Sequence, residues 1–229
     1  MFSMVVLGSP VLAGGPLEVS GRAEDAADWR DASDSSRVAE AFGRGMRVNG
    51  WLLFGSDPLT DNFGDTSHRA ESLPGYVAQV AVAQGARVAR FAAYATVSLP
   101  QSKESLAGTL TLDGAADQTE LLTVRIGAGA PAMLRLAVLT DNLGGPDYVP
   151  RGISLAVDGK EGSVVTVTPN GTPDWLFWTL PRLKEGSEIS LRVQSDNGVA
   201  AIGGLLFLSA SADVARKPVA AGPLPVIDH

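Results

Sequence analysis

From residue 48 onward, apolar and polar residues alternate with a period of two rather than 3.6. The alternation is clearest in residues 122–126, 134–138, 153–157 and 189–193, where every second residue is Ile, Leu or Val. Successive side chains of a strand point to opposite faces, so this pattern predicts strands with one buried face, as in antiparallel sheets. Weaker strand candidates span residues 50–54, 76–83, 88–98, 109–112, 163–168, 175–180 and 200–208.

Turn-forming pairs that contain glycine follow or separate these segments. The pair Asn197-Gly198 predicts a hairpin, because both residues tolerate a positive φ and strand candidates flank them directly. The other such pairs are Asp113-Gly114, Asp158-Gly159, Asn170-Gly171 and Glu185-Gly186. A helical pattern spans residues 33–42, with Ser or Asp as the N-cap and Gly43 as the stop. The fold class predicted is therefore all-β, an antiparallel jelly-roll β-sandwich with one short N-terminal helix and flexible ends.

The chain is predicted to contain one domain between two distinct ends. Residues 1–20 form a signal-like segment or an extended N-terminal arm, residues 21–211 a single β-sandwich, and residues 212–229 a flexible Pro-rich tail. The small-residue pattern at Val11 to Ala13 fits a cleavage site, whereas an ordinary N-terminal strand or arm is the alternative. The first interpretation predicts a secreted protein, extracellular or periplasmic.

Composition excludes several classes of function. The 229 residues hold 18 Lys+Arg against 25 Asp+Glu, a net charge of −7, which argues against a nucleic-acid or anionic-membrane surface. No apolar run approaches the ~18 residues of a membrane span. There is no Cys and there are two His, so disulfides, thiolate metal sites and multi-His centres are excluded. The G-x-S-x-G, H-E-x-x-H and phosphate-loop motifs are absent, so we predict that the protein is not an enzyme.

Two stretches resemble a known family in their layout. Residues 134–158 contain a strand that ends in Thr-Asp-Asn and an acidic aromatic loop, and residues 173–208 run from DWLFWTL to a Gly-Gly-apolar strand. This layout resembles galactose-binding-like jelly-roll domains, which occur as carbohydrate-binding modules and as accessory domains of secreted bacterial proteins. The resemblance covers residues 45–210, and it implies extracellular glycan or partner binding, often with a structural calcium ion.

Aromatic residues at 175–178 form the first candidate site. Alternation places Leu176 and Trp178 on one face and Trp175 and Phe177 on the other. If the second face is exposed, Trp175 and Phe177 form an aromatic platform for a sugar ring. The alternative is a strand with both faces interior, because Trp is mostly buried.

Polar residues between 140 and 148 form the second candidate site. Asp141, Asn142 and Asp147 can hydrogen-bond sugar hydroxyls, and Tyr148 can stack on a ring. In sandwiches the loops gather at the ends of the sheets, so this loop is expected to share an edge with another acidic loop. The alternative is a plain connection in which Asp and Asn shape the turn.

The acidic segment 55–68 is the candidate metal site. Its oxygen donors Asp57, Asp61, Asn62 and Asp65 are of the kind that Ca²⁺ prefers, although their spacing is not that of an EF-hand. A solvated turn that bonds its own backbone is the alternative.

These features predict a non-catalytic extracellular β-sandwich that binds a polysaccharide or a cell-surface protein. The alternative is a structural subunit of an extracellular or viral assembly, in which residues 1–20 and the tail contact neighbouring copies. A glycan-active enzyme with an unidentified pair of carboxylates is a third interpretation.

Overall fold

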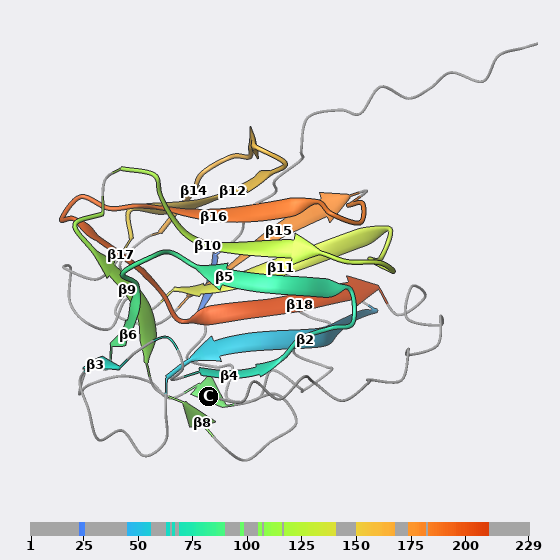
Figure 1. Cartoon of the computed structure of the whole chain (residues 1–229), viewed down its shortest axis with the longest axis horizontal. Coiled ribbons are helices and arrows are strands. Elements are labelled where there is room, and N and C mark those ends of the chain that lie inside the picture. The colour runs from blue at the N-terminus through green and yellow to red at the C-terminus, as the bar shows by residue number, and fades with distance from the viewer. Residues whose placement is uncertain are drawn as a thin grey trace, which may run out of the picture.

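A computed structural model of the whole chain shows its fold (Figure 1). It describes residues 23–25, 45–55, 63–64, 66, 69–89, 97–98, 105–106, 108–115, 117–140, 150–167, 174–181 and 183–210. The described residues contain strands and no helix, and every strand pair among them is antiparallel. Within these ranges, no helix is long and apolar enough to cross a membrane.

Two six-stranded sheets face each other, and the one with the longer strands has the order β1-β15-β11-β18-β2-β4. Its strands are β1 (Ala23–Asp25), β2 (Met46–Phe54), β4 (Arg69–Ser72), β11 (Met133–Thr140), β15 (Asp174–Pro181) and β18 (Gly204–Ala210). We call this the large sheet.

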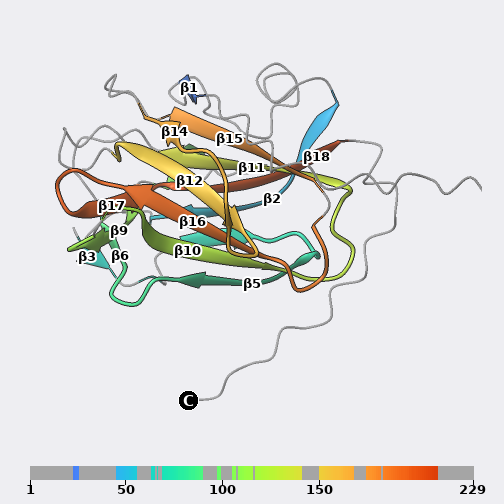
Figure 2. The ribbon, with the colours of Figure 1, turned by 90° about the horizontal axis from the view of Figure 1, so that it is seen from above.

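The second sheet has the order β13-β12-β16-β10-β5, and β14 also pairs with β12. Its strands are β5 (Val77–Val82), β10 (Thr119–Ile126), β12 (Gly152–Val157), β13 (Lys160–Glu161), β14 (Val165–Thr166) and β16 (Glu188–Gln194). We call this the facing sheet. Figure 2 shows the two sheets as separate layers.

A small sheet with the order β17-β9-β6-β3 lies at one end of the two layers (Figure 1, left). Its strands are β3 (Phe63–Gly64), β6 (Arg87–Ala89), β9 (Thr109–Asp113) and β17 (Val199–Ile202). A separate pair consists of β7 (Val97–Ser98) and β8 (Ser105–Leu106). The small sheet adds Leu110 and Ile202 to the main core and so closes that end.

The main hydrophobic core lies between the large and the facing sheet. In β12, Ile153 and Leu155 are fully buried in this core, and Ser154 between them points away from it. The same alternation in β15 places Leu176 and Trp178 in the core. The period-two pattern is therefore the physical origin of the sandwich, because a strand directs alternate side chains to opposite faces and so lines this core with every second residue.

The registers define two ends of the sandwich. One end carries the last residues of β2 and β11 and the first residues of β12, β15 and β18. Residues 55–62, 141–151 and 168–173 attach there, so we call it the loop-bearing end. At the opposite end, residues 127–132 and 182–187 join strands of the two sheets.

Most strand predictions are confirmed. The four segments with the clearest alternation lie in β10, β11, β12 and β16, and the candidates at 50–54, 76–83, 109–112 and 175–180 also coincide with strands. The candidate at 200–208 is two strands, because the chain leaves the small sheet at Ile202 and enters the large sheet at Gly204. The predicted helix at 33–42, the arm at 1–20 and the tail at 212–229 lie outside the described residues.

The predicted hairpin at Asn197-Gly198 is wrong. Gly198 does have a positive φ of 80°, but β16 pairs with β10 and β12, whereas β17 pairs with β9 of another sheet. The Ser195 hydroxyl oxygen accepts hydrogen bonds from the backbone N–H of Asn197 at 3.3 Å and of Val199 at 3.1 Å. These local bonds compete with ladder formation and turn the chain from one sheet to the next.

Candidate functional site

The proposed aromatic platform on β15 is not exposed. Trp175 is 1% exposed and Phe177 is 7% exposed. Both belong to a second hydrophobic cluster on the outer face of the large sheet, together with Leu139 and Leu206. The prediction of an exposed platform is therefore wrong, and the alternative of a strand with two interior faces is correct. Alternation separated the two faces of β15 correctly, but it carries no information on whether the second face is covered.

The other predicted site residues lie outside the described residues. These are Asp141, Asn142, Asp147 and Tyr148 of the polar loop, and Asp57, Asp61, Asn62 and Asp65 of the acidic segment. The structure describes the strands from which these two segments leave. Both segments leave the sandwich at its loop-bearing end, the acidic segment after β2 and the polar loop after β11.

Gly203 joins the bases of these two segments. Its carbonyl oxygen accepts a hydrogen bond of 3.0 Å from the Phe54 N–H, and its own N–H donates a bond of 2.7 Å to the Leu139 carbonyl. A Cβ at Gly203 would lie 2.8 Å from Leu139 Cδ2, so a larger residue cannot sit there without displacing Leu139. The two loop bases are therefore held together by backbone bonds through one glycine.

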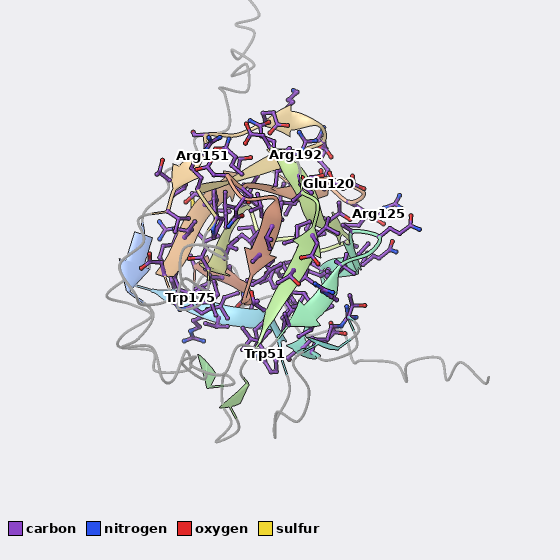
Figure 3. The ribbon with its side chains drawn as sticks, turned by 90° about the vertical axis from the view of Figure 1, so that its left-hand side faces the viewer. Trp51, Glu120, Arg125, Arg151, Trp175 and Arg192 are labelled. Atoms are coloured by element: carbon purple, nitrogen blue, oxygen red, sulfur yellow. The ribbon has the colours of Figure 1, made fainter. Side chains whose placement is uncertain are left out.

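Arg151 anchors the far base of the polar loop. Its guanidinium lies 3.0 Å from a carboxylate oxygen of Asp117 and 3.0 Å from one of Asp196. Its backbone N–H donates to Gln194 at 2.8 Å, and its carbonyl accepts from Val167 at 3.1 Å. Asp117 precedes β10, Asp196 follows β16 and Val167 follows β14, so Arg151 links three connections. Figure 3 looks onto this end and shows Arg151 at its edge.

The two connections that contain Asp117 and Asp196 are also hydrogen-bonded to each other. The Ala115 N–H donates to the Gly198 carbonyl at 2.8 Å, which joins the β9–β10 connection to the β16–β17 turn. The Asn197 side chain accepts a hydrogen bond of 2.7 Å from the Ser195 hydroxyl. Exposed ion pairs contribute only ~0–1 kcal/mol each, so the backbone bonds and the packing beneath them supply most of the rigidity of this end.

The loop-bearing end is suited to binding through oxygen and amide groups. It combines a rigid base with two attached segments rich in Asp and Asn. The carboxylate of Asp accepts hydrogen bonds, and the amide of Asn both accepts and donates them. Among the described residues, no group of three or more His, Asp or Glu can hold a metal ion. Sequence reasoning assigned no role to Arg151 or Gly203, because both act through partners that are distant in sequence.

Tyr76 belongs to the opposite end and not to this site. It directly precedes β5, whose Val77 pairs with Ile126 at the end of β10. Burial raises the pKa of Tyr76 to about 12, so the phenol stays neutral at physiological pH. It packs against the main core as an essentially apolar group.

Comparison with known proteins found no matching family model and no matching curated protein. Similar solved structures include the CBM35 from Cellvibrio japonicus Abf62, with 19% identity, a TM-score of 0.36, and coverage of 45% of this chain and 77% of that chain.

Two structures of an exo-beta-1,3-galactanase from Phanerochaete chrysosporium, both with beta-1,3-galactotriose, are also similar. One has 13% identity and a TM-score of 0.32 over 62% of this chain, and the other 14% and 0.24 over 82%. This chain spans 31% and 29% of their lengths. With TM-scores below 0.5, these likenesses transfer no site residue and no activity to this chain.

The burial of Trp175 generates a prediction about stability. Replacement of a buried Trp by Ala removes apolar contacts and leaves a cavity, so Trp175→Ala is expected to lower the free energy of unfolding by ~3–5 kcal/mol. The matched control is Met133→Ala, since Met133 is 46% exposed and its loss should cost less than ~0.5 kcal/mol. Urea denaturation of both variants measures the difference. A Trp175→Ala protein as stable as the Met133→Ala protein would contradict the burial of this side chain.

Proposed function

We propose that this protein is a non-catalytic carbohydrate-binding β-sandwich that binds polysaccharide at its loop-bearing end. The observation that carries the proposal is the convergence of the acidic segment and the polar loop on one rigid base, with Gly203 and Arg151 at its joints. Loops fixed at both ends lose less conformational entropy when a ligand orders them. The resemblance of residues 134–158 and 173–208 to carbohydrate-binding jelly-roll domains supports the same function.

The proposed chemistry is hydroxyl recognition by short polar side chains. Asp141 and Asp147 would accept hydrogen bonds from sugar hydroxyls, the Asn142 amide would both accept and donate, and Tyr148 would stack on the apolar face of a ring. We assign no role in this to Trp175 or Phe177, because both are buried.

The proposal includes the jelly-roll topology. Between β10 and β16 the chain crosses from one sheet to the other at the β10–β11, β11–β12, β14–β15 and β15–β16 connections, and β18 later enters the large sheet between β11 and β2. This crossing pattern is typical of jelly rolls and brings the connections from both layers to common ends. A secreted, extracellular or periplasmic location is proposed with it, in line with the signal-like segment.

The binding proposal is tested by affinity electrophoresis against a panel of soluble polysaccharides. We expect retardation by at least one of them, without release of reducing ends. Tyr148→Ala should weaken retention about tenfold, equivalent to about 1.4 kcal/mol, through loss of stacking and of its hydroxyl. Lys184→Ala, an exposed change at the opposite end, is the matched control and should bind like the unchanged protein. Retention that Tyr148→Ala leaves intact, or no retention by any polysaccharide, would overturn the proposal.

We further propose that Ca²⁺ binds the acidic segment through Asp57, Asp61, Asn62 and Asp65, on the donor chemistry of these residues. A ligand that binds only the folded state stabilises it, by about 2.7 kcal/mol at a hundredfold excess over Kd. Millimolar Ca²⁺ should therefore raise Tm by several degrees, and a chelator should reverse the rise. The double variant Asp57→Asn/Asp61→Asn should show no rise, whereas Glu185→Gln at the opposite end should retain it. If millimolar Ca²⁺ leaves the Tm of the unsubstituted protein unchanged, the proposed calcium site is wrong.

A further inference from the structure

Strand β5 is an open edge of the facing sheet. It pairs with β10 on one side, and no strand within the described ranges pairs with its other side. Figure 2 shows β5 along the outer margin of the molecule. Ala78, Gln79 and Ala81 are exposed, and Val80 and Val82 are only partly buried although they pack against the main core. The free side of this strand is therefore open to solvent.

The backbone of β5 directs hydrogen-bonding groups to this open side. The Ala83 N–H donates to the Leu121 carbonyl at 3.0 Å, so Ala83 directs its backbone groups toward β10. In an antiparallel ladder these directions alternate from residue to residue, so those of Ala81 also face β10, and those of Val80 and Val82 face away. The two valines therefore present donors and acceptors to a further strand.

The other edges of the two sheets carry charges, and β5 does not. The strand orders end at β1, β4 and β13, which are shorter than β5 and contain two charged residues each. Charged side chains and short length keep an edge strand from pairing with another chain. By contrast, β5 has six residues and lies within residues 72–86, a stretch of the sequence without a charged side chain. The devices that protect the other edges are therefore absent from this one.

We propose that β5 pairs edge to edge with β5 of a second copy of this chain, antiparallel about a two-fold axis. Two-fold symmetry makes one surface patch its own partner, so an identical edge supplies the same donors and acceptors in the opposite direction. The two facing sheets then form one continuous sheet across the dimer.

The backbone directions determine the register of this pairing. Antiparallel partners exchange both backbone hydrogen bonds only where the two residues direct their groups at each other, so Val80 of each copy pairs with Val82 of the other. Other registers lose one of these pairs, because the ladder shifts at a bulge beyond Gln79. Ala81 then lies on the axis opposite Ala81 of the second copy, in a non-hydrogen-bonded pair with Cα atoms ~4.5 Å apart.

Residue types and charge favour a second copy over an unrelated peptide. Edges that recruit a peptide select it through pockets for alternate side chains, and the exposed residues Ala78 and Ala81 are too small to line a pocket. Each chain carries a net charge of −7, so two copies repel least where they meet along an uncharged stretch. The small side chain of Ala81 also permits close approach at the axis.

The dimer places the two loop-bearing ends at opposite poles. Val82 lies at the loop-bearing end of β5, because β5 is antiparallel to β10 and β10 begins at that end. A two-fold axis at Ala81 turns the second copy end for end. This consequence rests on the proposed function: two polysaccharide sites that face away from each other suit the cross-linking of separate glycan chains.

Sedimentation equilibrium of the full chain, without polysaccharide and over a wide concentration range, tests the pairing. The unsubstituted protein should show a reversible monomer–dimer equilibrium. Ala81→Lys brings two like charges directly opposite each other and should weaken the dimer at least tenfold. Ala132→Lys, the same substitution at an exposed site of the opposite end, is the matched control and should leave the equilibrium unchanged. A monomer at every concentration, or a dimer that Ala81→Lys leaves intact, would show that β5 is not the interface.

Single cysteines test the register, and the chain contains no native Cys that could interfere. Ala81→Cys places two thiols in facing positions, within the Cα separation of ~4.4–6.8 Å that a disulfide spans, so oxidation should give a covalent dimer on non-reducing electrophoresis. Gln79→Cys is the control and should not cross-link, because its counterpart lies ~13 Å away along the strands. Equal cross-linking of both variants, or none with Ala81→Cys, contradicts the proposed pairing.

The pairing and the polysaccharide site fail separately, because neither association test contains polysaccharide. If the dimer forms and no polysaccharide is retained, the pairing stands and the proposed function is wrong. If polysaccharide is retained by a protein that stays monomeric, the pairing is wrong and the loop site stands.

Discussion

Burial of both faces of the large sheet along β15, β11 and β18 is the constraint on which the rest of the structure depends. Leu176 and Trp178 fill the space toward the facing sheet, and Trp175 and Phe177 are buried on the other side of the same strand. Such a strand is held by packing from two directions and offers no side chain to a ligand. We therefore place the binding chemistry at the ends of the strands.

The loop-bearing end shows how a rigid sandwich positions variable segments. Gly203 draws the β2 and β11 ends together through two backbone hydrogen bonds, and Arg151 connects three further turns. Side chains carried by such loops start from a fixed base, so less entropy is lost when a ligand orders them. The same core that buries Trp175 thus supports the segments proposed to bind sugar.

The sequence predicted what depends on local pattern and missed what depends on long-range contact. Strands such as β12 and β16 follow from alternation alone, and so does the division of Trp175 from Trp178 between two faces. Whether the Trp175 face is covered depends on other parts of the chain, to which alternation is blind. The residue types of Asn197-Gly198 predict a turn, and the chain does turn there. That this turn joins two different sheets depends on strand partners far away in sequence, which the residue types do not reveal. Arg151 carried no signal at all, because its partners come from separate connections.

Hydrogen–deuterium exchange with and without the bound polysaccharide tests the central claim most directly, because it maps the ligand without any substitution. The account predicts added protection in residues 141–149 and in the turns bonded to Arg151, at 115–118 and 195–198. The connections at the opposite end, 127–132 and 182–187, should exchange as before. Protection confined to that opposite end, with no change around Arg151, would contradict a binding site at the loop-bearing end.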